Sequence, residues 1–223
     1  MSYSRRMFFR EALAGAAAAA VAGQTLRPTV SAQTALSPDA AVQQLIDGNG
    51  RFAEGRMTSF DEDLSILKTK TVEKQEPFAA VLSCADSRVP VELIFDQSIG
   101  HVFVARVAGN IATSAMIASL EYGVAVLGNK AIMVLGHANC GAVQASIEAK
   151  AVPGQISVLY RYIRPAVDQA GPNLEATIKA NAKLQAALLR QSSPVLAEHI
   201  KQKQLKIVAA YYDLASGRVS ILD

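Results

Sequence analysis

Short apolar runs alternate with longer stretches of helical periodicity along most of the chain. The short runs predict strands at 78–83, 101–107 and 131–135, a weaker one at 206–210 and a last edge strand at 218–222. The longer stretches predict helices at 38–54, 91–95, 114–127, 141–149, 156–170, 174–190 and 194–204. Strands that alternate with helices indicate an α/β fold, in which a mostly parallel sheet is flanked by helices.

The first 32 residues follow a different pattern. Arg5 and Arg6 precede two phenylalanines, an alanine-rich stretch follows, and Val30-Ser31-Ala32 has the small residues of a cleavage site. The paired arginines resemble the twin-arginine export signal, so we expect residues 1–32 to direct export and then to be removed. An ordinary Sec signal or an uncleaved anchor is the alternative. Because the apolar stretch is short, we expect no stable membrane insertion after processing.

This interpretation places the protein in the periplasm or another extracytoplasmic compartment, with one domain formed by residues 33–223. The leader also explains the formal charge of +3, since residues 1–32 hold four of the 22 basic residues and one of the 19 acidic ones. The remaining 18 basic and 18 acidic residues balance. We therefore predict no nucleic-acid partner.

Two clusters of reactive side chains follow predicted strands. Cys84, Asp86 and Arg88 come after the strand at 78–83, and His137 and Cys140 come after the strand at 131–135. Ligands of such sheets bind at the carboxyl ends of the strands, and thiolate, imidazole and carboxylate are the usual zinc ligands. The two clusters could therefore converge on one ion. A disulfide between the cysteines and a plain Asp86–Arg88 ion pair are the alternatives.

The spacing argues against two other chemistries. A cysteine-based phosphatase needs its cysteine and arginine about six residues apart, whereas Cys84 and Arg88 are four apart. The His-x-Glu and Pro-Cys-x-x-Cys pattern of zinc deaminases is absent from the sequence.

The segments 84–90 and 136–141 resemble the two signature motifs of β-class carbonic anhydrases. The resemblance extends to 104–110 and 119–123, and it covers the chain from about residue 40 to residue 222. It implies a β-carbonic anhydrase fold with one zinc ion per chain on Cys84, His137 and Cys140, and with water or Asp86 in the fourth position. The implied reaction is the hydration of CO2 to bicarbonate and a proton. The family's site is built across a dimer, so we expect a homodimer or a higher homo-oligomer.

The resemblance also assigns three candidate catalytic residues. Asp86 either closes the site or is held away from the ion by Arg88, and Gln75, nine residues before Cys84, would donate to the substrate. Two alternatives remain: a hydrolase of carbonyl sulfide or carbon disulfide on the same scaffold, and a catalytically silent zinc-binding protein. Arg106, Gly109 and Asn110 are expected to shape a turn and a subunit contact.

Overall fold

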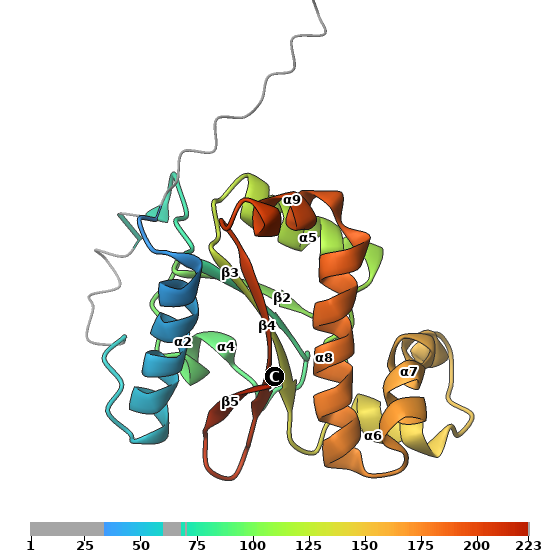
Figure 1. Ribbon diagram of the computed structural model, residues 1–223. Coiled ribbons are helices and arrows are strands. Elements are labelled where there is room, and N and C mark those ends of the chain that lie inside the picture. Colours follow the sequence, from blue (N-terminus) through green and yellow to red (C-terminus); the bar gives the residue numbers. More distant parts are fainter. Residues whose placement is uncertain (1–33, 60–67, 70, 223) are drawn as a thin grey trace, which may run out of the picture.

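The computed structural model describes residues 34–59, 68–69 and 71–222 (Figure 1). The predicted leader, residues 1–32, lies outside these ranges. Residues 60–67, in the polar stretch before the first strand, also lie outside them. Among the described residues, no helix combines the length and the apolar character that crossing a bilayer requires.

A five-stranded sheet forms the centre of the part of the chain that the structure describes. Its order is β2 (Val102–Arg106), β1 (Ala79–Ser83), β3 (Ala131–His137), β4 (Lys206–Tyr212) and β5 (Val219–Leu222). The first four strands are parallel, and β5 pairs antiparallel with β4 at the edge. The predicted α/β fold with a mostly parallel sheet is therefore confirmed.

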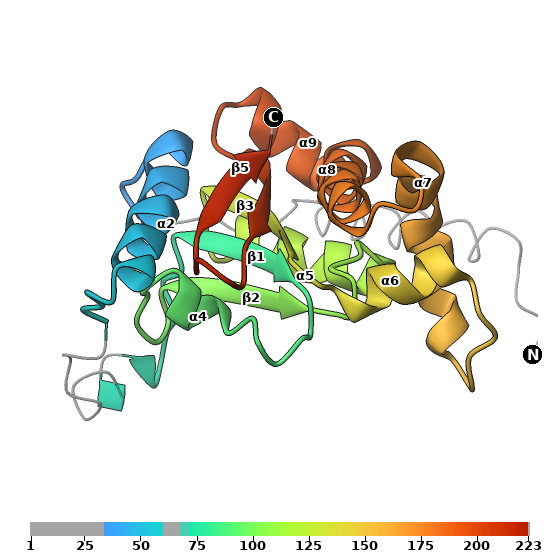
Figure 2. The same cartoon turned by 90° about the horizontal axis from the view of Figure 1, so that it is seen from below.

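Helices cover both faces of the sheet, as Figures 1 and 2 show. Their bounds are α2 (Pro38–Ala53), α4 (Val91–Ile94), α5 (Ser114–Ala125), α6 (Gly141–Glu148), α7 (Tyr160–Ala170), α8 (Leu174–Ser192) and α9 (Pro194–Lys201). A single 3-10 turn, η1 (Ile156–Leu159), precedes α7, where the sequence predicted one continuous helix. Four of the helices begin at a side-chain cap that accepts from the N–H three residues later: Ser37, Thr113, Asn173 and Ser193.

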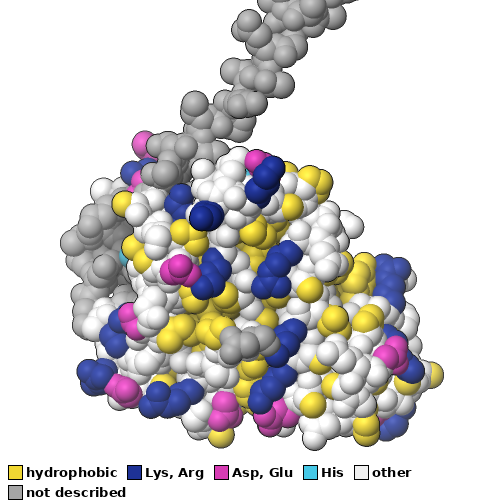
Figure 3. Space-filling view, viewed as in Figure 1, with side chains coloured by type: hydrophobic (Ala, Val, Ile, Leu, Met, Phe, Trp, Pro, Cys, Tyr) yellow, Lys and Arg dark blue, Asp and Glu magenta, His cyan; other side chains and the backbone are white. Residues whose placement is uncertain are grey.

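The two faces of the sheet belong to separate apolar clusters. On one face, Val81 of β1 and Met133 of β3 pack with α2 residues such as Leu45. On the other face, Leu82 and Ile132 pack against α5, α8 and α9. Because β1 and β3 are buried on both faces, their apolar runs are continuous rather than alternating. Between α2 and α8, over β4 and β5, Figure 3 shows apolar surface with Lys and Arg side chains around it.

The strand β3 is longer than predicted. Gly136 and His137 pair with Tyr211 and Tyr212 of β4, so His137 is the last residue of the strand rather than part of the loop after it. A Cβ atom at position 136 would lie 3.0 Å from the Ile178 side chain and 3.3 Å from its carbonyl oxygen, so glycine allows α8 to pack closely against the end of β3. Pairing with β4 thus fixes the backbone of His137 before its side chain makes any contact.

Candidate metal centre

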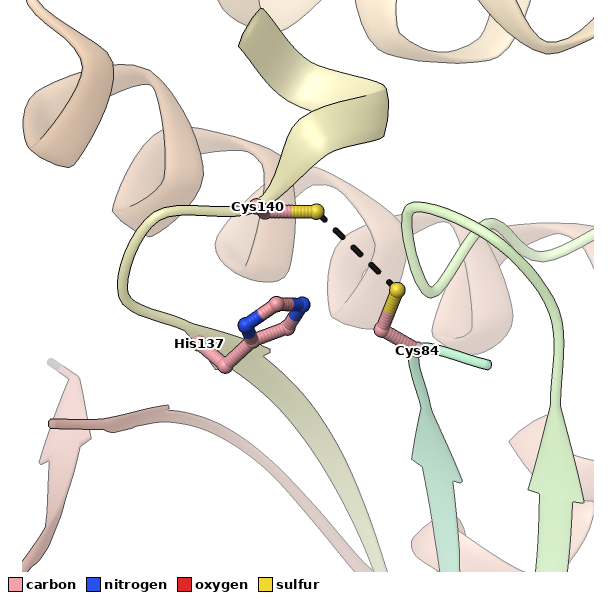
Figure 4. Close-up of side chains that lie close together, drawn as sticks. All are labelled: Cys84, His137 and Cys140. Carbon is pink, nitrogen blue, oxygen red and sulfur yellow. Dashed lines mark hydrogen bonds between the residues drawn. The ribbon is translucent and has the colours of Figure 1, made fainter. Parts of the chain in front are cut away.

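Three buried side chains meet at the carboxyl end of β1 and β3. Cys84 directly follows β1, His137 ends β3, and Cys140 is the N-cap residue of α6. Their donor atoms all lie within 4.8 Å of one another. Figure 4 shows the three side chains pointing toward a common space between the two strand ends. The predicted convergence of the two sequence clusters is therefore present in the structure.

The separation of the two sulfur atoms fits a shared metal ion. The Sγ atoms of Cys84 and Cys140 lie 4.0 Å apart and both thiols are free. A disulfide needs a separation of about 2.05 Å. Two thiolates on a tetrahedral zinc ion, each about 2.3 Å from it, would lie about 3.8 Å apart. The geometry therefore favours the ion over the disulfide.

The imidazole of His137 is oriented as a metal ligand. Its Nδ1 atom lies 2.9 Å from the carbonyl oxygen of Ala138, so Nδ1–H donates there and the lone pair remains on Nε2. Nε2 is buried and has no hydrogen-bond partner among the described residues. A buried acceptor without a partner is costly unless something binds it. A zinc ion bound to Nε2 would remove this cost, so the residues present fit the metal.

The pKa values of the two thiols are shifted in opposite directions by their contact. A hydrogen bond from Cys140, together with contacts with His137 and the Gly109 N–H, outweighs the effect of burial and lowers the pKa of Cys84 to about 4. The same hydrogen bond, together with burial and the neighbouring thiolate charge, raises the pKa of Cys140 well above its ordinary value. One thiolate therefore forms readily, and a divalent cation would displace the remaining proton.

Asp86 lies beside the three donors but is held by Arg88. Arg88 donates from Nε to Oδ1 at 2.9 Å and from Nη2 to Oδ2 at 2.7 Å, and its backbone N–H also reaches Oδ1. Its Nη2 further donates to the carbonyl of Asn139 at 3.1 Å, which ties the two loops together. These bonds hold the pKa of Asp86 well below its ordinary range. Oδ2 remains 3.9 Å from Nε2 of His137, so the carboxylate faces the site as an anion.

Two residues near the site have contacts that the sequence did not indicate. Arg106 donates to the carbonyl oxygens of Cys84 and Asp86, at 3.0 and 2.6 Å. The N–H of Gly109 donates to Cys84 Sγ at 3.3 Å. The register of β1 and β2 could have suggested this, since Arg106 pairs with Ser83 and so ends beside Cys84. Arg106 therefore fixes the backbone around Cys84, and Gly109 contacts the Cys84 sulfur directly. The sequence had predicted for them only a turn and a subunit contact.

Gln75 lies at the opposite end of β1. It lines a cavity of about 520 Å³ with residues that include Tyr122 and Leu127, near the amino-terminal end of the sheet. The eight residues between Gln75 and Cys84 include the whole of β1, a strand roughly 17 Å long. One copy of the chain therefore does not bring Gln75 to its own metal centre. Its catalytic role stays a prediction, and that role requires a second copy.

Comparison with known proteins identifies the family. A family model described as carbonic anhydrase matches residues 79–219. The chain is 34% identical over 201 residues to carbonic anhydrase 2 of Mycobacterium tuberculosis, which covers 84% of this chain and 94% of that protein. A β-carbonic anhydrase of Coccomyxa in complex with acetazolamide aligns with a TM-score of 0.63 and 26% identity, over 81% of this chain and 86% of that one.

A tetrameric β-carbonic anhydrase from Sordaria macrospora also shares the fold, with a TM-score of 0.63 and 22% identity over 71% of this chain and 90% of that one. The chain belongs to the carbonic anhydrase family, and it is an enzyme of the carbonate dehydratase type. Its mostly parallel five-stranded sheet is that of the β class, whose members are zinc enzymes.

Proposed function

We propose that this protein is a zinc-dependent carbonic anhydrase that interconverts CO2 and bicarbonate outside the cytoplasm. The observation that carries the proposal is the cluster of three buried donors, in which Nε2 of His137 faces two sulfur atoms without a partner among the described residues. The carbonic anhydrases among its relatives support the same reaction. Cys84, His137 and Cys140 would hold one ion per chain.

The side chains around the donors suit a small apolar substrate. When bound, a zinc ion supplies the Lewis acidity that makes water a nucleophile near neutral pH. Ile111, Val143 and Ile163 form an apolar wall beside the thiols, which favours uncharged CO2 over competing ions. Arg88 keeps Asp86 outside the donor cluster, so this carboxylate would leave an ion held by the three donors open to water and substrate. Since the carboxylate is anionic, it would accept a hydrogen bond from a water molecule or hydroxyl group that approaches the three donors.

We also propose that a second copy completes the site. Gln75 lies too far from Cys84 in the same chain, whereas a neighbouring copy could present its own Gln75 at the open side of the centre. The tetrameric assembly of the Sordaria relative supports a homodimer or a higher homo-oligomer. In this arrangement the amide of Gln75 would orient the substrate oxygen atoms.

The function is tested on protein that begins at Gln33. We expect about one zinc ion per chain by metal analysis, and rapid CO2 hydration in a stopped-flow assay with a pH indicator. His137→Asn should lose both the ion and the activity. The matched control is His101→Asn, which changes an exposed histidine at the other end of the sheet and should keep both.

The alternative functions give different results in the same experiments. A silent zinc-binding protein would hold zinc and hydrate no CO2. A hydrolase on this scaffold would release H2S from carbonyl sulfide or carbon disulfide faster than it hydrates CO2. Zinc-free, folded protein with a Cys84–Cys140 disulfide would contradict the proposed centre altogether.

The location outside the cytoplasm is a separate part of the proposal. It is supported by the paired arginines, the alanine-rich stretch and the small residues before Gln33. Replacing Arg5 and Arg6 with lysine should leave full-length precursor in the cytoplasm, as cell fractionation and immunoblotting would show. Continued export and processing of that variant would point to the Sec route.

A further inference from the structure

The loop after β2 places a backbone N–H on the Cys84 sulfur. Gly109 and Asn110 both have positive φ angles, 77° and 45°, and this turn directs the Gly109 N–H toward Cys84 Sγ at 3.3 Å. A Cβ atom at position 109 would come within 2.7 Å of the Ile163 side chain. The backbone angle therefore favours glycine at this position, and any larger residue would also have to displace the end of the Ile163 side chain. Such a loop conformation needs support from its surroundings.

Two buried amide side chains of α8 provide that support. Asn181 donates from Nδ2 to the carbonyl oxygen of Gly109 at 2.9 Å, and Gln185 accepts from the N–H of Ala112 at 2.9 Å. Gln185 Nε2 donates in turn to Asn181 Oδ1 at 3.1 Å and to the carbonyl oxygen of Tyr162 in α7 at 3.0 Å. Asn181 is fully buried and Gln185 is 3% exposed, so these are not surface contacts.

A core position on α8 could be filled at lower cost by an apolar residue. Burying an amide costs about 1–3 kcal/mol unless its hydrogen bonds are made, and here each nitrogen and oxygen of both amides has a partner. A satisfied buried network specifies one conformation of the groups that it joins. Here the network joins α8 to the loop at residues 109–112, whose Gly109 N–H contacts Cys84.

We propose that Asn181 and Gln185 are positioning residues for the metal centre, and that they act by holding the Gly109 N–H on the Cys84 thiolate. A hydrogen bond to a thiolate withdraws charge from the sulfur, which then donates less charge to the metal. With two thiolates in the donor set, this leaves the ion a stronger Lewis acid than it would otherwise be. The inference rests on the proposed zinc centre.

The test follows the sulfur–metal bond directly. Cobalt(II) replaces zinc, and the near-ultraviolet charge-transfer band from thiolate to cobalt reports the charge on the sulfur. Asn181→Leu removes the donor to Gly109 while it keeps a side chain of similar size. We expect the band to move to longer wavelength. We also expect zinc transfer to a chelator to become about 10–100-fold faster, because the unsupported loop no longer fixes the position of Cys84, and this loss outweighs the stronger charge donation of its sulfur.

A matched control separates positioning from stability. Thr177 lies one turn earlier on α8, is fully buried, and donates to the carbonyl oxygens of Gly171 and Asn173, away from the loop. Thr177→Val should lower the unfolding midpoint and leave the charge-transfer band and the rate of zinc release at wild-type values. Asn181→Ser is a milder second variant, whose hydroxyl is too short to reach Gly109, and it should show the same band shift as Asn181→Leu.

The outcomes distinguish this inference from the proposed function. A wild-type band together with wild-type zinc release in folded Asn181→Ser or Asn181→Leu would show that Asn181 is only structural, and would overturn the inference while the zinc centre stands. If wild-type protein with bound cobalt gave no thiolate charge-transfer band, the proposed centre itself would fail, and the inference with it.

Discussion

The contact between α2 and α4 leaves no space for a side chain at position 48. A Cβ atom on Gly48 would lie 1.9 Å from the carbonyl oxygen of Phe95 and 2.8 Å from its carbonyl carbon. Both of these atoms belong to the backbone, so no side-chain rotation can relieve the overlap. Gly50 stands two residues later in the same helix, and a Cβ atom there would meet nothing within 4 Å. The two glycines therefore form a matched pair for substitution by alanine.

The magnitudes follow from these contacts. Gly48→Ala forces α2 and Phe95 apart by roughly 1.1 Å before the contact reaches even 3.0 Å. That movement strains the buried hydrogen bond from Asn49 Nδ2 to the Ile94 carbonyl at 3.1 Å, worth about 1–3 kcal/mol. Overpacking adds about 1–3 kcal/mol, and alanine recovers about 0.5–1 kcal/mol in a helix. We expect a net loss of about 1–5 kcal/mol for Gly48→Ala and a gain of about 0.5–1 kcal/mol for Gly50→Ala.

Urea denaturation followed by far-ultraviolet circular dichroism measures both effects. The zinc concentration is kept fixed, because metal bound to the folded state adds to its stability. The unfolding midpoint should fall for Gly48→Ala and rise for Gly50→Ala, with similar slopes. If both variants shift the midpoint in the same direction, or if Gly48→Ala unfolds at the wild-type midpoint, the reasoning from the α2–α4 contact is wrong.

Three further predictions concern charge and assembly. Burial alone would raise the pKa of Asp96, but Arg51 and backbone N–H groups lower this pKa overall. The ionised Asp96 carboxylate therefore stabilises the fold above about pH 4, and this stabilisation is lost as the pH falls through the folded-state pKa. The difference in unfolding free energy between wild type and Asp96→Asn should therefore shrink in denaturation series carried below that pH. Arg88→Lys should keep its zinc and lose about 10-fold in kcat/KM for CO2, because lysine cannot donate twice to one carboxylate. The Gln75→Ala and His137→Asn variants should each be poorly active alone. If dimers share their sites, a fully exchanged mixture of equal amounts of the two variants should regain about a quarter of the wild-type activity. A mixture that regains none would contradict the second-copy proposal.

The sheet and the metal donors could be predicted because their signals are local. The continuous apolar runs of β1 and β3 end directly at Cys84 and His137, and parallel strands bring their carboxyl ends together. The strand ends were less accurate: His137 belongs to β3 because pairing with β4 continues to Tyr212, and nothing within the β3 segment encodes the length of its neighbour. The limits of the strands were therefore decided by tertiary pairing.

The support around the donors could not be predicted, because it depends on contacts distant in sequence. Asn181 is 72 positions from Gly109, and on a helical pattern it reads as an ordinary polar residue. The contact of Gly109 with Cys84 arises from the positive φ angles of its loop. A glycine in the sequence does not by itself reveal such an angle, because glycine also occurs where φ is negative. Gln75 is near Cys84 in sequence and far from it in space, because the whole of β1 lies between them.

The arrangement of the strands also determines at which stage of folding and export the metal can bind. Cys84 follows β1 and His137 ends β3, and β2 and α5 lie between them in the sequence. A complete donor set therefore requires that β1 and β3 have already paired. On the proposed twin-arginine route the chain crosses the membrane already folded, and it would take its zinc from the metal pool of the cytoplasm. A chain threaded through the membrane unfolded would instead depend on the metal available at its destination.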